Sequence, residues 1–520
     1  MLKDISAKIP AYADILYDVL SFVGGMNSRT SELFMSRDAK FSLRKDEAPL
    51  IVNMVRTKSG LLTTRPGRVK LNASAIVPAA GSDDVLSLFE LRPANGNDSV
   101  LATAGNGIFK YITGSFVSQG TTATNNKRFH WCQFKDKALG INGTDAMVSY
   151  DGTALGTVAA APVDGTAILS HRNRVWIIRG KTLSYCALGD ETDWTTTNNA
   201  GSVPIPVTRG IGGTAMISLW DRLIVTSGQQ VFQLLGTSAT DFVLSPVNLI
   251  YGHTGTPEAF IAAGNDIYYV NKRGIHSLSV VFAQSVTGDV STGYASSKVE
   301  PTWQSLHESN LPNVVGVHDS IRNMMLFLCS RGGAPNTEAF AGDYLHLDEQ
   351  GSPTWSLFDN MPFASALEVQ SLSSKPEVLF GGYDGFVYKQ TNDETDVGST
   401  IPVQLQYRTD LELPAFSKLW RHMLLFASGQ DTTLSGNIVF DFGRQSIPFT
   451  VDLDVEGGDI IGTTFTIGQS VLGVPALKEV RVSVPGHGRF ATITMSASSL
   501  HRVTIGGFII YAGVRRTAFQ

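Results

Sequence analysis

Hydrophobic and polar positions alternate along most of this chain, and short alternating runs recur around glycine-centred turns. Alternation with a period of two is typical of half-buried β-strands. Six copies combine an apolar strand, a turn and a second strand, and their turns are centred on Gly105, Gly143, Gly180, Gly228, Gly274 and Gly385. A hairpin that returns about every 40 to 50 residues is typical of the blades of a β-propeller.

The last two of these turns are far enough apart for one further repeat. The segment from Met324 to Asp348 has the same strand pattern, but Gly332 and Gly333 begin a longer hairpin loop there. The repeats therefore predict a mainly β protein with a propeller of about seven blades over residues 71–425, within the usual range of four to eight blades.

The two ends of the chain have different patterns. Between Pro10 and Val23, apolar residues recur at helical spacing and Gly24 follows, so the sequence predicts an N-terminal helix. We expect residues 1–70 to form this helix and a basic docking segment. Residues 426–520 contain short alternating strands separated by turns, which predicts a β-sandwich or jelly-roll-like module.

Charge is distributed unevenly. Between Arg29 and Lys70, ten basic and four acidic residues give a net charge of +6, which leaves −11 for the remainder of a chain whose total is −5. Complementary charge steers association, so this segment is a candidate assembly interface with acidic neighbours. A solvated basic loop and contact with DNA are the alternatives. The candidate interface residues are Arg29, Arg37, Lys40, Arg44, Lys45 and Arg56.

No local pattern predicts catalysis or a cofactor. The chain has no GxSxG or HExxH motif, and its acidic turns lack a complete metal-ligand set. Cys132, Cys186 and Cys329 are far apart, so we expect three buried packing residues and neither a disulfide framework nor a zinc site. The sequence also predicts no secretory leader and no membrane-spanning stretch.

One region carries a more specific signal. Between Phe22 and Gly67, a GG-x-N turn (Gly24, Gly25, Asn27) is followed by a DEAP segment (Asp46 to Pro49), by Asn53, and by a G-L-x-x-R-P-G close that ends at Arg65, Pro66 and Gly67. This order resembles the opening of tail nozzle proteins of short-tailed bacteriophages, also called tail tubular or packaged-DNA stabilisation proteins. The segments His171 to Ile178, Leu188 to Trp194 and Gly381 to Lys389 resemble later parts of the same family.

The resemblance implies a structural virion protein that is assembled in the host cytoplasm and is not an enzyme. It implies a ring of six subunits below the portal and the adaptor protein, with fibre, spike or needle proteins beside or beneath it. Double-stranded DNA would be retained in the ring and would pass through it transiently; no cofactor, metal or membrane is implied. The main alternative is a glycan-binding or glycan-cleaving propeller, such as a receptor-binding tail protein, which needs an acidic or aromatic cluster at one end of its central channel. A cytosolic scaffold propeller of a host cell is a second alternative.

Overall fold

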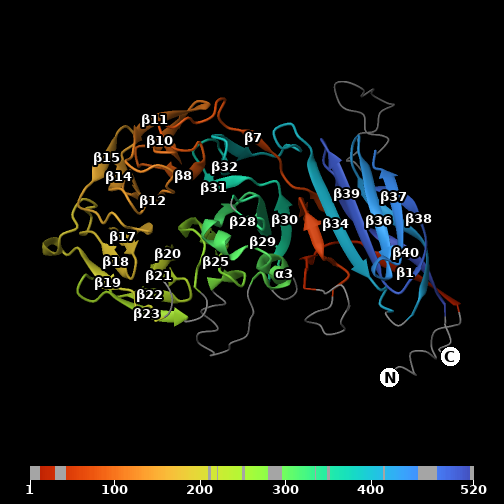
Figure 1. Ribbon diagram of the computed structural model, residues 1–520. Helices are drawn as coiled ribbons and strands as arrows, with labels where there is room; N and C mark the ends of the chain where they lie inside the picture. The colour runs from red at the N-terminus through yellow and green to blue at the C-terminus, as the bar shows by residue number, and fades with distance from the viewer. Residues whose placement is uncertain are drawn as a thin grey trace. The chain divides into compact units, whose positions relative to one another are not determined.

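A computed structural model describes residues 12–29, 43–208, 212–219, 221–248, 252–278, 295–333, 335–347, 352–413, 416–454 and 477–515. These residues form a mainly β protein (Figure 1). The chain divides into two compact units. Unit 1 comprises Met1–Arg68, Asp348–Asp359 and Thr391–Gln520, and unit 2 comprises Val69–Leu347 and Asn360–Gln390.

Unit 2 is a β-propeller of seven antiparallel sheets, or blades, that follow one another along the chain. The first four blades are β8 (Val85–Leu91), β9 (Ser99–Ala104), β10 (Gly107–Ile112) and β11 (Ser115–Thr121); β12 (His130–Phe134), β13 (Lys137–Ile141), β14 (Met147–Tyr150) and β15 (Leu155–Val158); β16 (Ala167–His171), β17 (Arg174–Arg179), β18 (Thr182–Tyr185) and β19 (Gly201–Pro204); and β20 (Gly213–Leu219), β21 (Arg222–Ser227), β22 (Val231–Leu235) and β23 (Val243–Asn248).

The last three blades complete the ring. They contain β24 (Ile261–Ala263), β25 (Asp266–Val270) and β26 (Ile275–Ser277); β27 (Val315–Asp319), β28 (Met324–Cys329) and β29 (Glu338–Asp343); and β31 (Phe363–Val369), β32 (Glu377–Gly382) and β33 (Val387–Gln390). Short helical segments lie between strands at η1 (Thr196–Asn198), η2 (Pro257–Ala259), η3 (Ser297–Val299), α3 (Glu300–Gln304) and η4 (Glu308–Asn313).

The first strand of each blade lies innermost. Around the ring, β8 neighbours β12, β12 neighbours β16, β16 neighbours β20, and β20 neighbours η2, which leads directly into β24; β24 then neighbours β27, β27 neighbours β31, and β31 returns to β8. Figure 1 shows these blades, coloured from orange to teal, around a common centre. Because the inner strands form a closed cycle, the ring encloses a central channel.

Ring closure uses a strand that precedes the first blade in sequence. The last blade has the order β31-β32-β33-β7, and its outer strand β7 spans Arg68–Lys70. The amide of Leu71 donates to the carbonyl of Val387 at 2.8 Å, and the Asn72 side chain accepts from the Val387 amide at 2.8 Å. The two ends of unit 2 are therefore hydrogen-bonded to each other within one sheet.

The predicted turns lie where the repeats placed them. Each of the six glycines lies between the second and third strands of its blade, and Gly332 and Gly333 lie in the longer loop between β28 and β29. Gly105 and Gly385, for example, have φ values of 54° and 76°, which L-residues rarely adopt. The prediction of about seven blades is confirmed.

Apolar side chains fill the spaces between neighbouring blades. Trp176 of β17, Leu223 of β21 and Phe232 of β22 are fully buried in one such cluster. Cys132 and Cys186 are buried together in another cluster, and Cys329 is also buried and unpaired. Burial raises the pKa of the Cys132 thiol, which keeps it protonated. The expectation that the cysteines are packing residues is confirmed.

Unit 1 is a β-sandwich. One sheet has the order β38-β35-β40-β6-β5, with β1 also paired to β40, and the other contains β30-β4-β34-β39-β36-β37. The strands are β1 (Tyr12–Val19), β4 (Leu50–Val52), β5 (Met54–Arg56), β6 (Leu62–Thr64), β30 (Thr354–Asp359), β34 (Ile401–Thr409), β35 (Lys418–Ser428), β36 (Thr433–Phe440), β37 (Gln445–Asp452), β38 (Lys478–Gly488), β39 (Ala491–Ser499) and β40 (Thr504–Arg515), with η5 (Asp441–Gly443) between β36 and β37.

Aromatic pairs join the two sheets of the sandwich. Tyr407 of β34 meets Phe508 of β40 edge to face, with ring centroids 5.0 Å apart, and Trp420 of β35 meets Phe440 of β36 at 5.3 Å. All four side chains are essentially inaccessible to solvent. Edge-to-face aromatic pairs of this kind stabilise a core beyond their simple burial.

The predicted N-terminal helix is wrong. Residues Tyr12–Val19 form β1, which pairs antiparallel with β40 from Tyr12 opposite Arg515 to Val19 opposite Phe508. Tyr17 and Val19 are buried, whereas Leu16 and Leu20 are more than half exposed. A helix would have placed Leu16 and Leu20 on the same face as Val19, but strand pairing selected a period of two.

The unit boundaries also differ from those expected. Unit 2 ends at Gln390 instead of residue 425, and residues 12–29 and 43–68 are part of unit 1 instead of a separate docking segment. The physical reason is strand pairing: β35 pairs along its length with β38 and β40, so a boundary at residue 425 would cut through it. Likewise β4 pairs with β34, and β6 pairs with β40.

Candidate functional site

The first two elements of the N-terminal motif fold against each other in unit 1. Strand β2 (Gly25–Met26) pairs in parallel with β3 (Glu47–Ala48). The Asn27 side-chain amide donates to the Glu47 carboxylate at 2.7 Å, and the Asn27 backbone amide donates to the Ala48 carbonyl at 2.8 Å. A Cβ atom at Gly24 would lie 2.4 Å from the Glu47 side chain, so this contact needs glycine. The GG-x-N and DEAP segments therefore pair with each other.

Asn53 joins the next two elements. It lies between β4 of one sheet and β5 of the other, with a φ of 54°, and its side chain is fully buried. Its side-chain amide donates to the Pro402 carbonyl at 2.8 Å, and its side-chain oxygen accepts from the Asp359 amide and from Arg65 Nε, both at 2.9 Å. Asparagine suits this position because it tolerates the left-handed conformation and supplies both donors and an acceptor.

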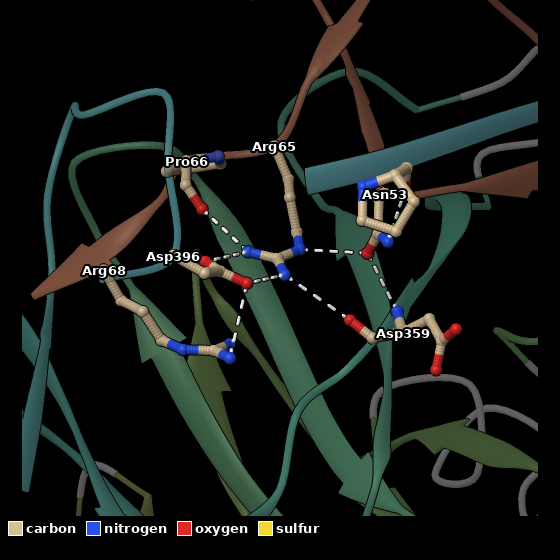
Figure 2. A network of polar contacts seen from close by, with 7 residues as sticks. Asn53, Arg65, Pro66, Arg68, Asp359 and Asp396 are labelled. Carbon is tan, nitrogen blue, oxygen red and sulfur yellow. Dashed lines mark hydrogen bonds and ion pairs between the residues drawn. The ribbon is translucent and has the colours of Figure 1, made fainter. Parts of the chain in front are cut away.

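Arg65 is the centre of a buried ion-pair network (Figure 2). Its two terminal nitrogens bind both carboxylate oxygens of Asp396, at 3.0 and 2.6 Å, and one of them also donates to the Pro66 carbonyl at 3.1 Å. Arg68 reaches the same carboxylate at 3.3 Å. The exposed fractions of the Arg65, Asp396 and Arg68 side chains are only 2%, 4% and 8%. Two buried arginines therefore share one buried carboxylate.

Gly67 is required for a different reason from the one its sequence suggested. A Pro-Gly turn predicts a positive φ, but Gly67 is not among the residues with positive φ. Instead, a Cβ atom there would lie 2.1 Å from the Thr395 carbonyl oxygen and 2.8 Å from that of Asp393. The Gly67 amide donates to the Asp393 carbonyl at 2.8 Å. Close backbone approach, and not backbone conformation, selects glycine.

Two basic residues of the candidate interface form ion pairs with acidic residues of the same chain. Arg44 binds Asp46 at 3.0 Å, and Lys45 binds Asp18 at 3.3 Å and Glu412 at 3.7 Å. Together with the buried Arg65 and Arg68, these contacts make the available positive charge smaller than the sequence count of +6. The remaining interface residues are Arg29 and Arg56, which are partly buried, and Arg37 and Lys40, which lie outside the described residues.

The central channel of unit 2 contains a cavity of about 330 Å³. Its wall is built from the inner strands of four blades, β8, β12, β27 and β31, and from η2 and β24 of a fifth. The lining side chains include three aromatic residues, Phe89, Trp131 and Phe260, and two acids, Glu258 and Glu368. The Trp131 ring stacks on Phe89 with centroids 5.8 Å apart. The repeat pattern predicts a channel, but the acids themselves lie in no motif.

Glu258 bridges the channel. Its carboxylate contacts His130 Nδ1 at 2.7 Å. His130 begins the inner strand of the second blade and Glu258 precedes that of the fifth, so this contact joins blades that are not neighbours. Burial alone would raise the pKa of Glu258, but the charge and hydrogen bond of His130 and the charge of Arg128 outweigh burial and lower the pKa to about 2. Glu258 is therefore ionised at neutral pH.

Glu368 has a different environment. Its carboxylate accepts from the Ser320 amide at 2.7 Å and lies 3.5 Å from His318 Nδ1. Burial would raise the pKa of Glu368, but hydrogen bonds from His318 and Ser320 outweigh burial and lower the pKa. The other ring nitrogen of His318 contacts the Tyr344 hydroxyl at 2.7 Å. Within the described part of the chain, the ion pair of Glu368 is with His318 and not with an arginine or lysine.

Within the described ranges, no group of three or more His, Cys, Asp or Glu side chains is placed to hold a metal ion. No helix in the same ranges is long and apolar enough to cross a membrane.

Comparisons with known proteins find similarity to solved structures at low sequence identity. No family model and no curated protein matches the chain. Similar solved structures include YCF48 bound to a D1 peptide (12% identity, TM-score 0.37, covering 63% of this chain and 98% of that chain) and the C-terminal WD40 domain of Sif2 (12%, 0.38, 66% and 98%). The computationally designed Ika8 protein is also similar (12%, 0.36, 70% and 99%).

Proposed function

We propose that this protein is the tail nozzle of a short-tailed bacteriophage. In this proposal, six copies of the chain form a ring that lies in the virion tail below the portal and adaptor rings. Fibre, spike or needle proteins attach beside or beneath it. The ring retains packaged DNA and conducts it during ejection, and the protein has no catalytic role.

The observation that carries the proposal is that the motif residues make their contacts inside unit 1. The polar side chains shared with nozzle proteins, Asn27, Asn53 and Arg65, all make contacts inside unit 1. Arg65 is almost completely buried. Such residues hold a scaffold together and do not present a reactive surface, which is what an assembly part requires. The resemblance therefore concerns architecture, and its elements are the ones that build the sandwich.

Passage of DNA fits the charge of the chain. A net charge of −5 gives the DNA backbone little reason to adhere, because nonspecific DNA binding depends on neutralising phosphates with Lys and Arg. DNA would pass through the ring of subunits. The propeller's own channel is unsuited to this, because the His130 to Glu258 contact crosses it.

Electron microscopy of the purified protein tests the proposal. We expect rings of about six subunits with a bore wide enough for duplex DNA, or such rings on addition of the adaptor complex. A protein that stays monomeric or trimeric under both conditions contradicts the proposal.

The basic segment provides a sharper test of assembly. Arg44 and Lys45 are poor targets, because reversing them would break ion pairs within the subunit. We therefore expect Arg37→Glu with Lys40→Glu to block ring formation or attachment while the subunit stays folded. The matched control reverses two exposed lysines of unit 2, Lys181 and Lys375. Normal assembly of the first variant at physiological salt would show that the segment is only a solvated surface.

A glycan-binding propeller remains the second candidate, and one observation favours it. The channel cavity contains the acidic and aromatic side chains that such a protein needs, including Glu258, Glu368 and Trp131. Polysaccharide binding or cleavage by a protein that forms no ring would support this candidate over the nozzle.

A further inference from the structure

The channel cavity has an unbalanced set of side chains. Its lining contains two carboxylates, Glu258 and Glu368, and no lysine or arginine; His318 and apolar or aromatic residues make up nearly all the rest. Both carboxylates are partly buried, with exposed side-chain fractions of 32% for Glu258 and 19% for Glu368, and such groups are stabilised by donors or positive charge. The groups that offset the negative charge of each acid therefore indicate which kind of ligand the cavity can bind.

The two acids differ in compensation. Glu258 contacts His130 and lies in the field of Arg128, whose guanidinium is fixed by the carbonyls of Leu86 and Ala364 at 2.7 and 2.8 Å. Glu368 is held by the Ser320 amide and by His318, and neither carries a permanent charge. Among the described residues, Glu258 Oε2 is buried without a hydrogen-bond partner, but the permanent charge of Arg128 offsets the charge of Glu258. Glu368 has no permanent positive charge beside it in the same part of the chain, so the net negative charge of the cavity is at Glu368.

The inner strands indicate that the acids lie at different depths. Arg128 binds Leu86 and Ala364, so these three residues lie at one level of the channel. His130, which holds Glu258, is two residues beyond Arg128, whereas Glu368 is four residues beyond Ala364. At about 3.3 Å per residue, the two carboxylates are separated by roughly 7 Å along the channel. Arg128 is thus farther from Glu368 than from Glu258.

We propose that this cavity binds a small organic cation, an alkylammonium ion whose ammonium group donates to Glu368 and whose hydrocarbon body packs against Phe89, Trp131 and Phe260. An ammonium group and a carboxylate form a strong charge-assisted hydrogen bond, and aromatic faces attract cations further. Small-molecule sites usually combine an apolar wall with a few placed polar groups, as this cavity does. The inference does not depend on the proposed nozzle function.

A sugar fits this chemistry less well. Its hydroxyl groups need acceptors and donors in similar numbers. The lining side chains offer two carboxylate acceptors, but their donors are limited to Trp131 and His318, and both ring nitrogens of His318 already face Tyr344 and Glu368. An ammonium group needs only acceptors.

The test is calorimetric titration of the full-length protein at pH 7.5 and low salt with three probes: n-butylammonium, the neutral isostere n-butanol, and glucose. We expect n-butylammonium to bind about tenfold or more tightly than n-butanol, since hydrogen bonds to charged groups contribute roughly twice as much as neutral ones. Glucose should bind most weakly.

Three variants locate the charge that is responsible. Glu368→Gln, which retains an acceptor for the Ser320 amide, should remove the preference for the cation. Glu258→Gln should weaken cation binding less, by under about threefold, because Arg128 already compensates this acid. Glu308→Gln is the matched control, since this exposed acid pairs with Lys272 and does not line the cavity.

Several results would overturn the proposal. These are equal affinity for n-butanol and n-butylammonium, tighter binding of glucose than of the cation, no cation binding at millimolar concentration, or equal losses in Glu368→Gln and Glu308→Gln. Circular dichroism checks that each variant is folded. If Glu368→Gln is unfolded, the comparison of the three probes in the unmodified protein still decides between the two ligand classes.

Discussion

Replacing Asp396 with alanine should destabilise unit 1 more than any exposed charge substitution. The change removes the carboxylate that binds Arg65 through both oxygens and Arg68 through one. Both arginine side chains are at least nine-tenths buried, so solvent cannot take the place of the lost partner. The variant would leave two buried positive charges without their shared acid.

The magnitude follows from the remaining contacts. Removing one partner of a buried ion pair typically costs about 3 to 5 kcal/mol. Arg65 would keep three acceptors, namely Asn53 Oδ1 at 2.9 Å and the carbonyls of Pro66 and Asp359 at 3.1 and 3.4 Å. We therefore expect a loss near the lower limit, about 3 kcal/mol in the free energy of unfolding of unit 1. Asp396→Asn, which keeps an acceptor of the same shape, should lose less.

The assay is urea unfolding of the full-length protein, followed by circular dichroism and tryptophan fluorescence. Unfolding of the fragment 69–390 identifies the transition that belongs to unit 2. The control is Asp14→Ala, which removes an exposed ion pair with Arg421 in the same unit. Surface pairs of this kind contribute less than about 1 kcal/mol.

A double-mutant cycle with Arg65→Gln separates pairing from burial. The coupling energy between positions 65 and 396 should account for most of the loss in Asp396→Ala. If Asp396→Ala costs no more than Asp14→Ala, the network is not a source of stability and the reasoning from burial is refuted.

Three further predictions concern the backbone, pH and the unit boundaries. Gly67→Ala should destabilise unit 1 by about 1 to 3 kcal/mol in the same urea assay, because its Cβ would overlap the Thr395 carbonyl. An unchanged midpoint of urea unfolding would show that the backbone segments around Gly67 and Thr395 can move apart without loss of stability. Burial lowers the pKa of His253 to about 4, so the folded state stays neutral while the unfolded state gains a proton below about pH 6.5. The contribution of neutral His253 to the free energy of unfolding is complete above about pH 6.5 and falls by at most about 3 kcal/mol as the pH decreases to 4. In thermal melts, His253→Gln should therefore lose less stability than the unmodified protein over that pH range. The same pH dependence of the melting temperature in both proteins would contradict the low pKa of His253. Fragment 69–390 should fold alone, and the absence of a cooperative thermal transition in it would contradict this. Fragment 1–427 lacks β36 to β40, so β1 and β35 lose their partners and the sandwich should not form; a complete sandwich transition in this fragment would contradict that expectation.

The propeller could be predicted because its signal is local and repeated. Each blade places a glycine between its second and third strands, so Gly105 and Gly385 indicate hairpins without any knowledge of distant residues. The N-terminal strand had no such signal. Ile15, Leu16, Val19 and Leu20 satisfy helical spacing, and only the pairing partner β40, almost 500 residues away, makes the segment a strand.

The sites could be predicted only where their residues belong to a local sequence motif. The motif indicated Asn53 and Arg65, but Asp396 is 331 residues from Arg65 and lies in no pattern of its own. The channel acids are a similar case, because Glu258 and Glu368 become neighbours only when the inner strands of different blades meet around one axis. Sequence patterns identify residues that share an element, whereas these sites are formed by residues that share only a position in space.

The hydrogen-bonded ends of unit 2 have a consequence for how the chain folds during synthesis. Unit 1 is built from segments on both sides of unit 2, so β1, and one edge each of β4 and β6, have no partner until residues beyond 390 have been made. Closing a flexible loop of roughly 320 residues would cost about 5 kcal/mol by the logarithmic dependence on loop length. Once β7 pairs with β33, this cost has already been met, because residues 68 and 391 are held together. We expect the propeller to fold first and then to act as a template that brings the two halves of the sandwich into register, and destabilised β7 variants should accumulate aggregated chains in which unit 1 never forms.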